Sequence, residues 1–189
     1  QEIRTFASLD APYNILLVID RSGSMGTEFP FLLKAVNGFM RNLRTQDMFA
    51  MAAFDRSVKK LVNWRSVRVG PQNKVNLGAG GDTNFYKALE WAADELRKVR
   101  GRKAALFYTD GEDYRIHDPD LDAKAFKRAL QTVRRANAPC HFVGLAVDSQ
   151  LGGAHLKQLA EVTGGQAHFP ETVEGLVPLY DQISRELGN

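Results

Sequence analysis

A short apolar run near the start of the chain stops abruptly at an acidic residue. Residues 15–19 read Ile-Leu-Leu-Val-Ile, and Asp20 follows them directly. An unbroken apolar run of this length, bounded by polar turn residues, is typical of a strand that is buried on both faces. Strands of that kind belong to parallel sheets covered by helices. The run therefore predicts a layered α/β domain.

Segments with strand and helix patterns alternate along the rest of the chain. Apolar runs of strand length lie at 15–19, 47–54, 58–64, 103–108, 140–147 and 166–169. Apolar residues at helical spacing lie at 31–43, 83–100, 122–136, 151–163 and 172–187. This alternation predicts an α/β fold of three layers, a Rossmann-like (doubly wound) and mostly parallel sheet with helices on both faces.

One strand of this sheet is expected to run against the others. Segment 58–64 follows segment 47–54 across a brief turn and carries Lys59 and Lys60, which suit the exposed edge of a sheet. We therefore expect one antiparallel edge strand. The length of 189 residues fits a single domain. We take residues 1–13 as a lead-in segment and residues 14–189 as the domain.

Oxygen-bearing side chains alternate directly after the first strand. Asp20, Ser22 and Ser24 lie two residues apart, and Gly23 between the serines allows the backbone to curl. Three such side chains can then converge on one point. A carboxylate and two hydroxyls suit a hard cation such as Mg²⁺ or Mn²⁺, which prefers oxygen ligands.

Two further segments are expected to reach the same edge of the sheet. Asp110 follows the apolar run 103–108, and Thr83 opens the helical segment 83–100 after a glycine-rich stretch. In open parallel sheets, ligands bind outside the carboxyl ends of the strands. We expect Asp82 to cap the helix that begins near Thr83. Glu112 and Asp113 add negative charge beside Asp110, and the sequence leaves open whether they repel acidic partners or bind a second cation.

Composition excludes several classes of protein. The net charge of +3 arises from Lys and Arg mixed with Asp and Glu, without the interleaved aromatic residues typical of a nucleic-acid interface. No apolar run is long enough to span a membrane, so no membrane insertion is expected. The single cysteine, Cys140, allows no internal disulfide and is expected to be buried. The four histidines lack the spacing of zinc ligands.

The acidic and hydroxyl motifs together resemble those of the von Willebrand factor type A domain. The three pieces of that family's metal-ion-dependent adhesion site occur here in the family's order: Asp20-Arg-Ser22-Gly-Ser24, Gly80-Gly81-Asp82-Thr83 and Thr109-Asp110-Gly111. The order of elements over residues 14–187 is similar as well. The lead-in before Asp20 resembles that of the bacterial, acidobacterial-type members. In Asp82 the chain departs from the residue that the family often has before the threonine.

The resemblance implies a role for each of the five site residues. Ser22 and Ser24 would bind the metal through their hydroxyls, and Thr83 would bind it directly or through water. Asp20 and Asp110 would act directly or through the waters of the metal. The metal would be Mg²⁺ or Mn²⁺, with Ca²⁺ as a further candidate. An Asp or Glu of a partner protein would complete the coordination.

The expected function is therefore a non-enzymatic, metal-dependent protein-binding module for adhesion or interaction. One alternative is a Mg²⁺-dependent phosphotransferase or hydrolase, which also has Asp at strand ends but needs an acid–base partner and a phosphate-binding loop. The other alternative is a structural scaffold with a vestigial metal site. The start at Gln1 rather than Met fits a processed part of a larger protein, and we expect a secreted, periplasmic or cell-surface location.

Overall fold

A six-stranded sheet forms the centre of the molecule. The computed structural model describes residues 12–23, 29–67, 80–109, 119–144, 150–170 and 178. The strands are β1 (Tyr13–Asp20), β2 (Met48–Phe54), β3 (Val58–Ser66), β4 (Arg102–Tyr108), β5 (Cys140–Val143) and β6 (Ala167–His168). The helices are α1 (Phe29–Asn42), α2 (Phe85–Arg97), α3 (Pro119–Arg135) and α4 (Gln150–Thr163).

The sheet is mostly parallel, with one antiparallel pair. Its strand order is β3-β2-β1-β4-β5-β6, and β1 lies between β2 and β4. Every neighbouring pair is parallel except β2 and β3. The predicted fold class is thus confirmed, including the antiparallel strand at the edge. Because the order reverses around β1, the carboxyl ends of β1 and β4 lie next to each other, where open sheets bind ligands.

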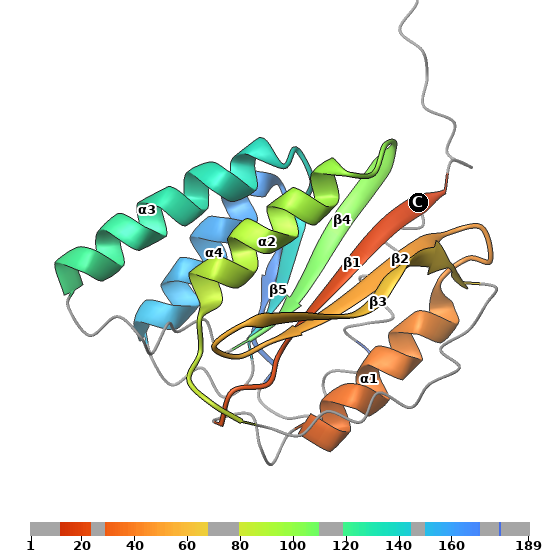
Figure 1. The fold of residues 1–189 in the computed structure, drawn as a ribbon, viewed down its shortest axis with the longest axis horizontal. Coiled ribbons are helices and arrows are strands. Elements are labelled where there is room, and N and C mark those ends of the chain that lie inside the picture. The colour runs from red at the N-terminus through yellow and green to blue at the C-terminus, as the bar shows by residue number, and fades with distance from the viewer. Residues whose placement is uncertain are drawn as a thin grey trace, which may run out of the picture.

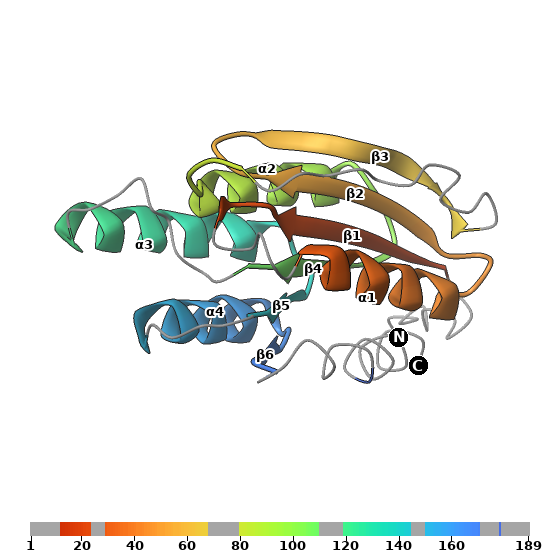
Figure 2. The same cartoon turned by 90° about the horizontal axis from the view of Figure 1, so that it is seen from below.

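Side chains of β1 alternate between two apolar cores, one on each face of the sheet. Leu16 and Val18 pack in a core to which α2, α3 and α4 contribute. Ile15, Leu17 and Ile19 pack in a second core with α1. Figures 1 and 2 show α1 on the opposite face of the sheet from α2 and α3. This burial on both faces is what the unbroken apolar run of β1 predicts.

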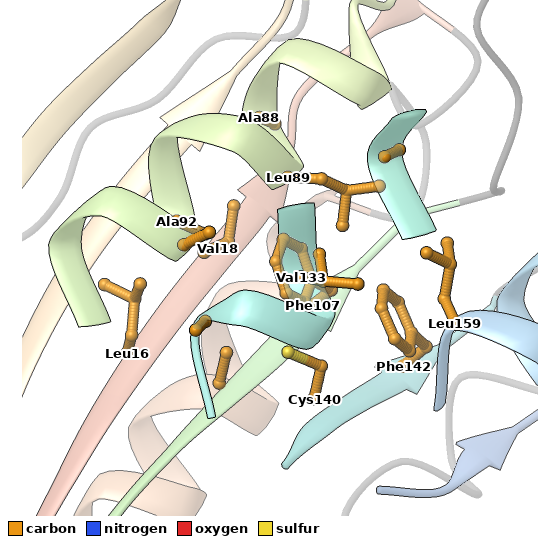
Figure 3. Close-up of a cluster of buried hydrophobic side chains, with 14 of the residues drawn as sticks. Leu16, Val18, Ala88, Leu89, Ala92, Phe107, Val133, Cys140, Phe142 and Leu159 are labelled. Carbon is orange, nitrogen blue, oxygen red and sulfur yellow. The ribbon is translucent and has the colours of Figure 1, made fainter. Parts of the chain in front are cut away.

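The larger core holds the three helices of one face against the strands. Figure 3 shows Leu89 of α2, Val133 of α3 and Leu159 of α4 around the ring of Phe142 from β5. That ring stacks on the ring of Phe107 from β4, with 4.9 Å between the centroids. Among the described residues, no helix is both long and apolar enough to cross a bilayer.

Several expected boundaries differ from the observed ones. The helix expected over residues 83–100 begins at Phe85 and ends at Arg97, and the one expected from residue 122 begins at Pro119. The last strand is short, Ala167–His168. The expected helix 172–187 and the lead-in segment lie outside the described residues, apart from positions 12, 13 and 178. The proposed division into residues 1–13 and 14–189 therefore stays a prediction.

A buried carboxylate of helix α2 forms a salt bridge with the edge strand β3. Glu95 of α2 is buried and forms salt bridges with Lys60 of β3 and Lys98 at the end of the helix. Burial raises the pKa of Glu95, but the hydrogen bonds and charges of the two lysines outweigh this effect and hold the pKa below its ordinary value. The ionised form therefore stabilises the folded state.

Glu95→Gln is expected to lower the free energy of unfolding by about 2 kcal/mol at neutral pH, because it removes charge-assisted hydrogen bonds. The difference from wild type should shrink as the pH falls below about 4.5, where the unfolded chain takes up its proton first. Urea unfolding between pH 3 and 7 measures both effects. Glu90→Gln is the control, since the Glu90 side chain on the same helix is 45% exposed and, among the described residues, pairs only with Arg128, at 3.9 Å. If the difference in unfolding free energy between wild type and Glu95→Gln were the same at pH 3 as at pH 7, the stabilising role of the ionised carboxylate would be contradicted.

Candidate functional site

Asp20 lies at the carboxyl end of β1 and is fully buried. Its Oδ1 accepts a hydrogen bond of 2.8 Å from the backbone N–H of Ser22, as an aspartate often does two residues along a turn. Its Oδ2 accepts one of 2.8 Å from the hydroxyl of Thr109, which directly follows β4. The carboxylate is therefore held between two neighbouring strands. Each oxygen of a carboxylate has two lone pairs, so one such bond does not prevent it from binding a cation.

The loop after β1 lies directly against the segment before α2. The Gly80 N–H donates to the carbonyl of Arg21 at 2.9 Å, and the Gly23 N–H donates to the carbonyl of Gly81 at 3.2 Å. Gly81 has a φ of +83°, a conformation that favours glycine at this point of close approach. Figure 1 shows these two segments meeting below the carboxyl end of β1. Ser22 and Thr83 therefore belong to adjacent segments, although 60 residues of sequence separate them.

The side chain of Thr83 carries a buried hydroxyl that no described residue hydrogen-bonds. Thr83 is 0% exposed, and its Oγ1 has no partner among the described residues. A buried hydroxyl in this state costs about 1–3 kcal/mol. An oxygen donor of this kind fits a hard cation, which would supply the missing partner. The residues described at this edge of the sheet thus fit the metal that the resemblance implies.

Asp82 does not have the capping role expected from the sequence. Helix α2 begins at Phe85 with Asn84 as its N-cap, and the Asn84 side chain makes no capping hydrogen bond. Asp82 instead pairs with Arg56 of the β2–β3 turn at 3.0 Å, with both side chains largely exposed. The prediction was wrong because residues 80–84 are held by bonds to other loops, which delays the helix by two residues. The carboxylate of Asp82 is engaged by Arg56.

Of the five expected ligands, the structure describes Asp20, Ser22 and Thr83. Ser24 and Asp110 lie outside the described residues, as do Glu112 and Asp113. Within the described ranges, no three His, Cys, Asp or Glu side chains lie together as a metal-binding group. A metal held by those parts of the chain would therefore need hydroxyl ligands as well, which Ser22 and Thr83 provide.

A second acidic residue, Asp55, lies where β2 ends. Its carboxylate pairs with Arg21 and accepts a hydrogen bond of 3.0 Å from the N–H of Ser57. Burial raises the pKa of Asp55, but the bond from the Ser57 amide and the hydrogen bond and charge of Arg21 hold it below its ordinary value. Asp55 is therefore an ionised group beside the loop that carries Ser22.

Sequence reasoning missed two features of this site. Thr109 orients Asp20, and its place at the end of a strand next to β1 is a signal that the sequence does contain. The pairing of Arg21 with Asp55 has no comparable signal, because the two residues are 34 positions apart and meet only in the folded chain. Both features lie at the carboxyl end of β1, at its last residue or at the first residue of the following loop.

Comparison with known proteins agrees with the resemblance at the level of the domain family. A sequence model described as the von Willebrand factor type A domain matches residues 13–169. Among solved structures, a von Willebrand factor type A protein from Catenulispora acidiphila is similar, with a TM-score of 0.78 and 18% identity over 94% of this chain and 43% of that one. The PilB minor pilin from Streptococcus sanguinis has a TM-score of 0.78 and 14% identity over 94% and 61% of the two chains.

A third similar structure is the vWF domain of the type V pili tip protein Mfa5 from Porphyromonas gingivalis. Its TM-score is 0.70 at 13% identity, over 93% of this chain and 95% of that one. At such identities the similarity concerns the fold. The chain spans about half of the first two relatives, 43% and 61% of their length. No curated protein matches the sequence.

Proposed function

The chain belongs to the von Willebrand factor type A domain family, and on that basis we propose that it is a non-enzymatic protein-binding module that depends on a divalent metal. Domains of this family are generally involved in protein interactions. The observation that carries the metal dependence is the hydroxyl of Thr83, fully buried without a hydrogen-bond partner among the described residues. Its segment lies against the loop that contains Ser22.

Five residues would hold the metal: Asp20, Ser22, Ser24, Thr83 and Asp110. Asp20 is already oriented by the Ser22 amide and the Thr109 hydroxyl. Asp110 directly follows Thr109, so the hydrogen bond from Thr109 to Asp20 supports the inclusion of Asp110. Oxygen donors of this kind favour Mg²⁺ or Mn²⁺, with Ca²⁺ as a weaker candidate.

The charge of the ligand set supports a partner that presents an acidic side chain. Two carboxylates balance a divalent cation, and the hydroxyls of the serines and the threonine add no charge. When bound, the metal would supply an electrophilic centre for an incoming carboxylate. An Asp or Glu of a partner protein is therefore the proposed ligand. The exposed Asp82 is paired with Arg56, which leaves less unbalanced negative charge near the site to repel such a partner.

The test is Thr83→Val, which exchanges the buried hydroxyl for a methyl group of similar size. In EDTA we expect the variant to be more stable than wild type by about 1 kcal/mol, because an unsatisfied polar group is removed. With Mg²⁺ or Mn²⁺ we expect wild type to melt at a higher temperature, since a ligand of the folded state stabilises it, and the variant to lose most of this gain. Calorimetric melting measures both.

Thr109→Val is the matched control, because it makes the same chemical change at a hydroxyl that is hydrogen-bonded to Asp20. It should lower stability in EDTA. If Thr83→Val lowered it as well, the buried hydroxyl would have another role. If Mg²⁺, Mn²⁺ and Ca²⁺ all failed to raise the melting temperature of wild type, the domain would be a structural scaffold. Phosphate-ester hydrolysis that depends on Asp20 would instead indicate an enzyme.

We also propose that the domain is part of a larger protein that acts outside the cell or at its surface. The similar PilB and Mfa5 structures are described as a minor pilin and a pili tip protein, which supports this location. The chain covers 61% of the PilB chain, which is compatible with further domains. Cell fractionation with an antibody against the domain tests the location.

A further inference from the structure

Asp55 makes contacts with both segments that carry described ligands of the proposed site. Its backbone carbonyl accepts a hydrogen bond of 2.9 Å from the N–H of Asn84, the residue after Thr83. Its carboxylate accepts a hydrogen bond from the Arg21 guanidinium, and Arg21 precedes Ser22. Its other oxygen bonds the N–H of Ser57 and fixes the β2–β3 turn. Asp55 thus joins three loops without supplying a ligand itself.

Both the backbone and the side chain of Arg21 form hydrogen bonds to the segments around Asp55. Its N–H donates to the carbonyl of Phe54 at 2.9 Å, and its carbonyl accepts from the N–H of Gly80 at 2.9 Å. The side chain then reaches across to Asp55. Since Arg21 lies between Asp20 and Ser22, any change in its position would move both of these residues.

The ion pair of Arg21 and Asp55 is shielded from solvent, unlike the neighbouring ion pair of Arg56 and Asp82. Its side chains are 28% and 12% exposed, whereas those of Arg56 and Asp82 are 68% and 55% exposed. Exposed ion pairs contribute little, since water and salt screen them. A shielded pair that also bonds backbone groups can hold loops in one arrangement. The two pairs involve adjacent residues of the β2–β3 turn and form a natural comparison.

We propose that Arg21 and Asp55 are positioning residues of the metal site, which hold the Ser22 loop and the Thr83 segment at the spacing that the metal requires. This inference rests on the proposed function. Groups that orient metal ligands without touching the metal commonly change its affinity by about tenfold to a hundredfold. The pair therefore sets the affinity for Mg²⁺ or Mn²⁺, and through it the affinity for an acidic partner.

The experiment compares the direction in which two substitutions change the affinity for Mn²⁺. Arg21→Met removes a positive charge from the loop, so charge alone would strengthen the binding of a cation. Asp55→Asn removes a negative charge, so charge alone would weaken it. A positioning role predicts that both variants bind Mn²⁺ about tenfold more weakly or worse. Titration calorimetry with Mn²⁺ measures the affinities. Arg56→Met and Asp82→Asn make the same charge changes at the neighbouring exposed pair and are the matched controls, expected to shift the affinity only slightly and in the direction of charge alone, stronger for Arg56→Met and weaker for Asp82→Asn.

A second measurement tests the same inference without any metal. In EDTA, the amides of Gly23, Gly80 and Asn84 should exchange their hydrogens faster in Arg21→Met and Asp55→Asn than in wild type, while amides of β1 and β4 keep their protection. Binding by Arg21→Met that equals or exceeds that of wild type would overturn the inference, as would unchanged exchange of the three loop amides. If wild type bound no Mn²⁺, the proposed function would fail, and the exchange data would still decide whether the pair orders the loops.

Discussion

Asp20→Asn is expected to abolish the response to metal while leaving the metal-free fold almost unchanged. The amide keeps the shape of the carboxylate, and its oxygen can still accept the bond from the Ser22 N–H. Its NH₂ group can donate to the Thr109 hydroxyl, which serves as acceptor as readily as donor. The contacts of the carboxylate with Ser22 and Thr109 are thereby retained. The negative charge that a cation requires is lost.

The size of the effect follows from mass action. At a metal concentration about a hundred times the dissociation constant, wild type should gain about 2.7 kcal/mol, and Asp20→Asn should gain almost nothing. In EDTA the two proteins should unfold within about 1 kcal/mol of each other. Calorimetric melting in EDTA, Mg²⁺ and Mn²⁺ measures both quantities. Asp94→Asn on the exposed side of α2 is the control and should respond to metal as wild type does. A full metal response in Asp20→Asn would exclude Asp20 as a ligand.

Gly165→Ala is expected to destabilise the domain strongly, although it adds only one methyl group. A Cβ at this position would lie 2.1 Å from the carbonyl oxygen of Cys140 and 2.5 Å from its carbon. These are backbone atoms at the start of β5, so they cannot turn away as the end of a side chain can. The strand or the end of α4 must move, at a cost of about 3 kcal/mol or more.

The neighbouring glycine provides the matched control. Gly164 has a φ of +77°, and a Cβ there would meet no atom within 4 Å, so Gly164→Ala should cost only the strain of the backbone, about 1 kcal/mol. Cys140 is buried, and burial raises the pKa of its thiol to about 12. The native thiol should therefore react with Ellman's reagent very slowly. Gly165→Ala should make this single thiol reactive, whereas Gly164→Ala should not. Equal stability of the two variants would contradict the predicted clash between a Cβ at position 165 and the backbone of Cys140.

Sequence patterns predicted the sheet well because they record burial. The run at 15–19 is apolar at every position, and both faces of β1 are indeed covered. The lysines at 59 and 60 marked the edge strand for the same reason. The alternation of strands and helices also predicted that the carboxyl ends of β1 and β4 lie at the same edge of the sheet, whereas their direct adjacency is known only from the observed strand order. These inferences depend on regular spacing, which a sequence displays directly.

The parts of the site that sequence reasoning missed depend on contacts between loops. Asp82 has the residue type of a helix cap, yet it faces Arg56, and α2 starts at Phe85. Nothing in the sequence relates Arg21 to Asp55, because neither residue belongs to a periodic pattern. Thr83 is a short polar residue whose complete burial arises from the backbone bonds on either side of it. Such positions are set by the tertiary fold and become visible only with it.

The hydrogen bond between Thr109 and Asp20 joins residues that are 89 positions apart. The Gly80 and Gly23 contacts likewise close long loops of chain. A ribosome must therefore release more than half of the domain before these groups can meet, and the sheet must pair β1 with β4 first. The proposed metal site is therefore complete only when both strands have been synthesised and have paired. A nascent chain that ends before β4 would therefore lack the capacity to bind a partner that we propose for the folded domain.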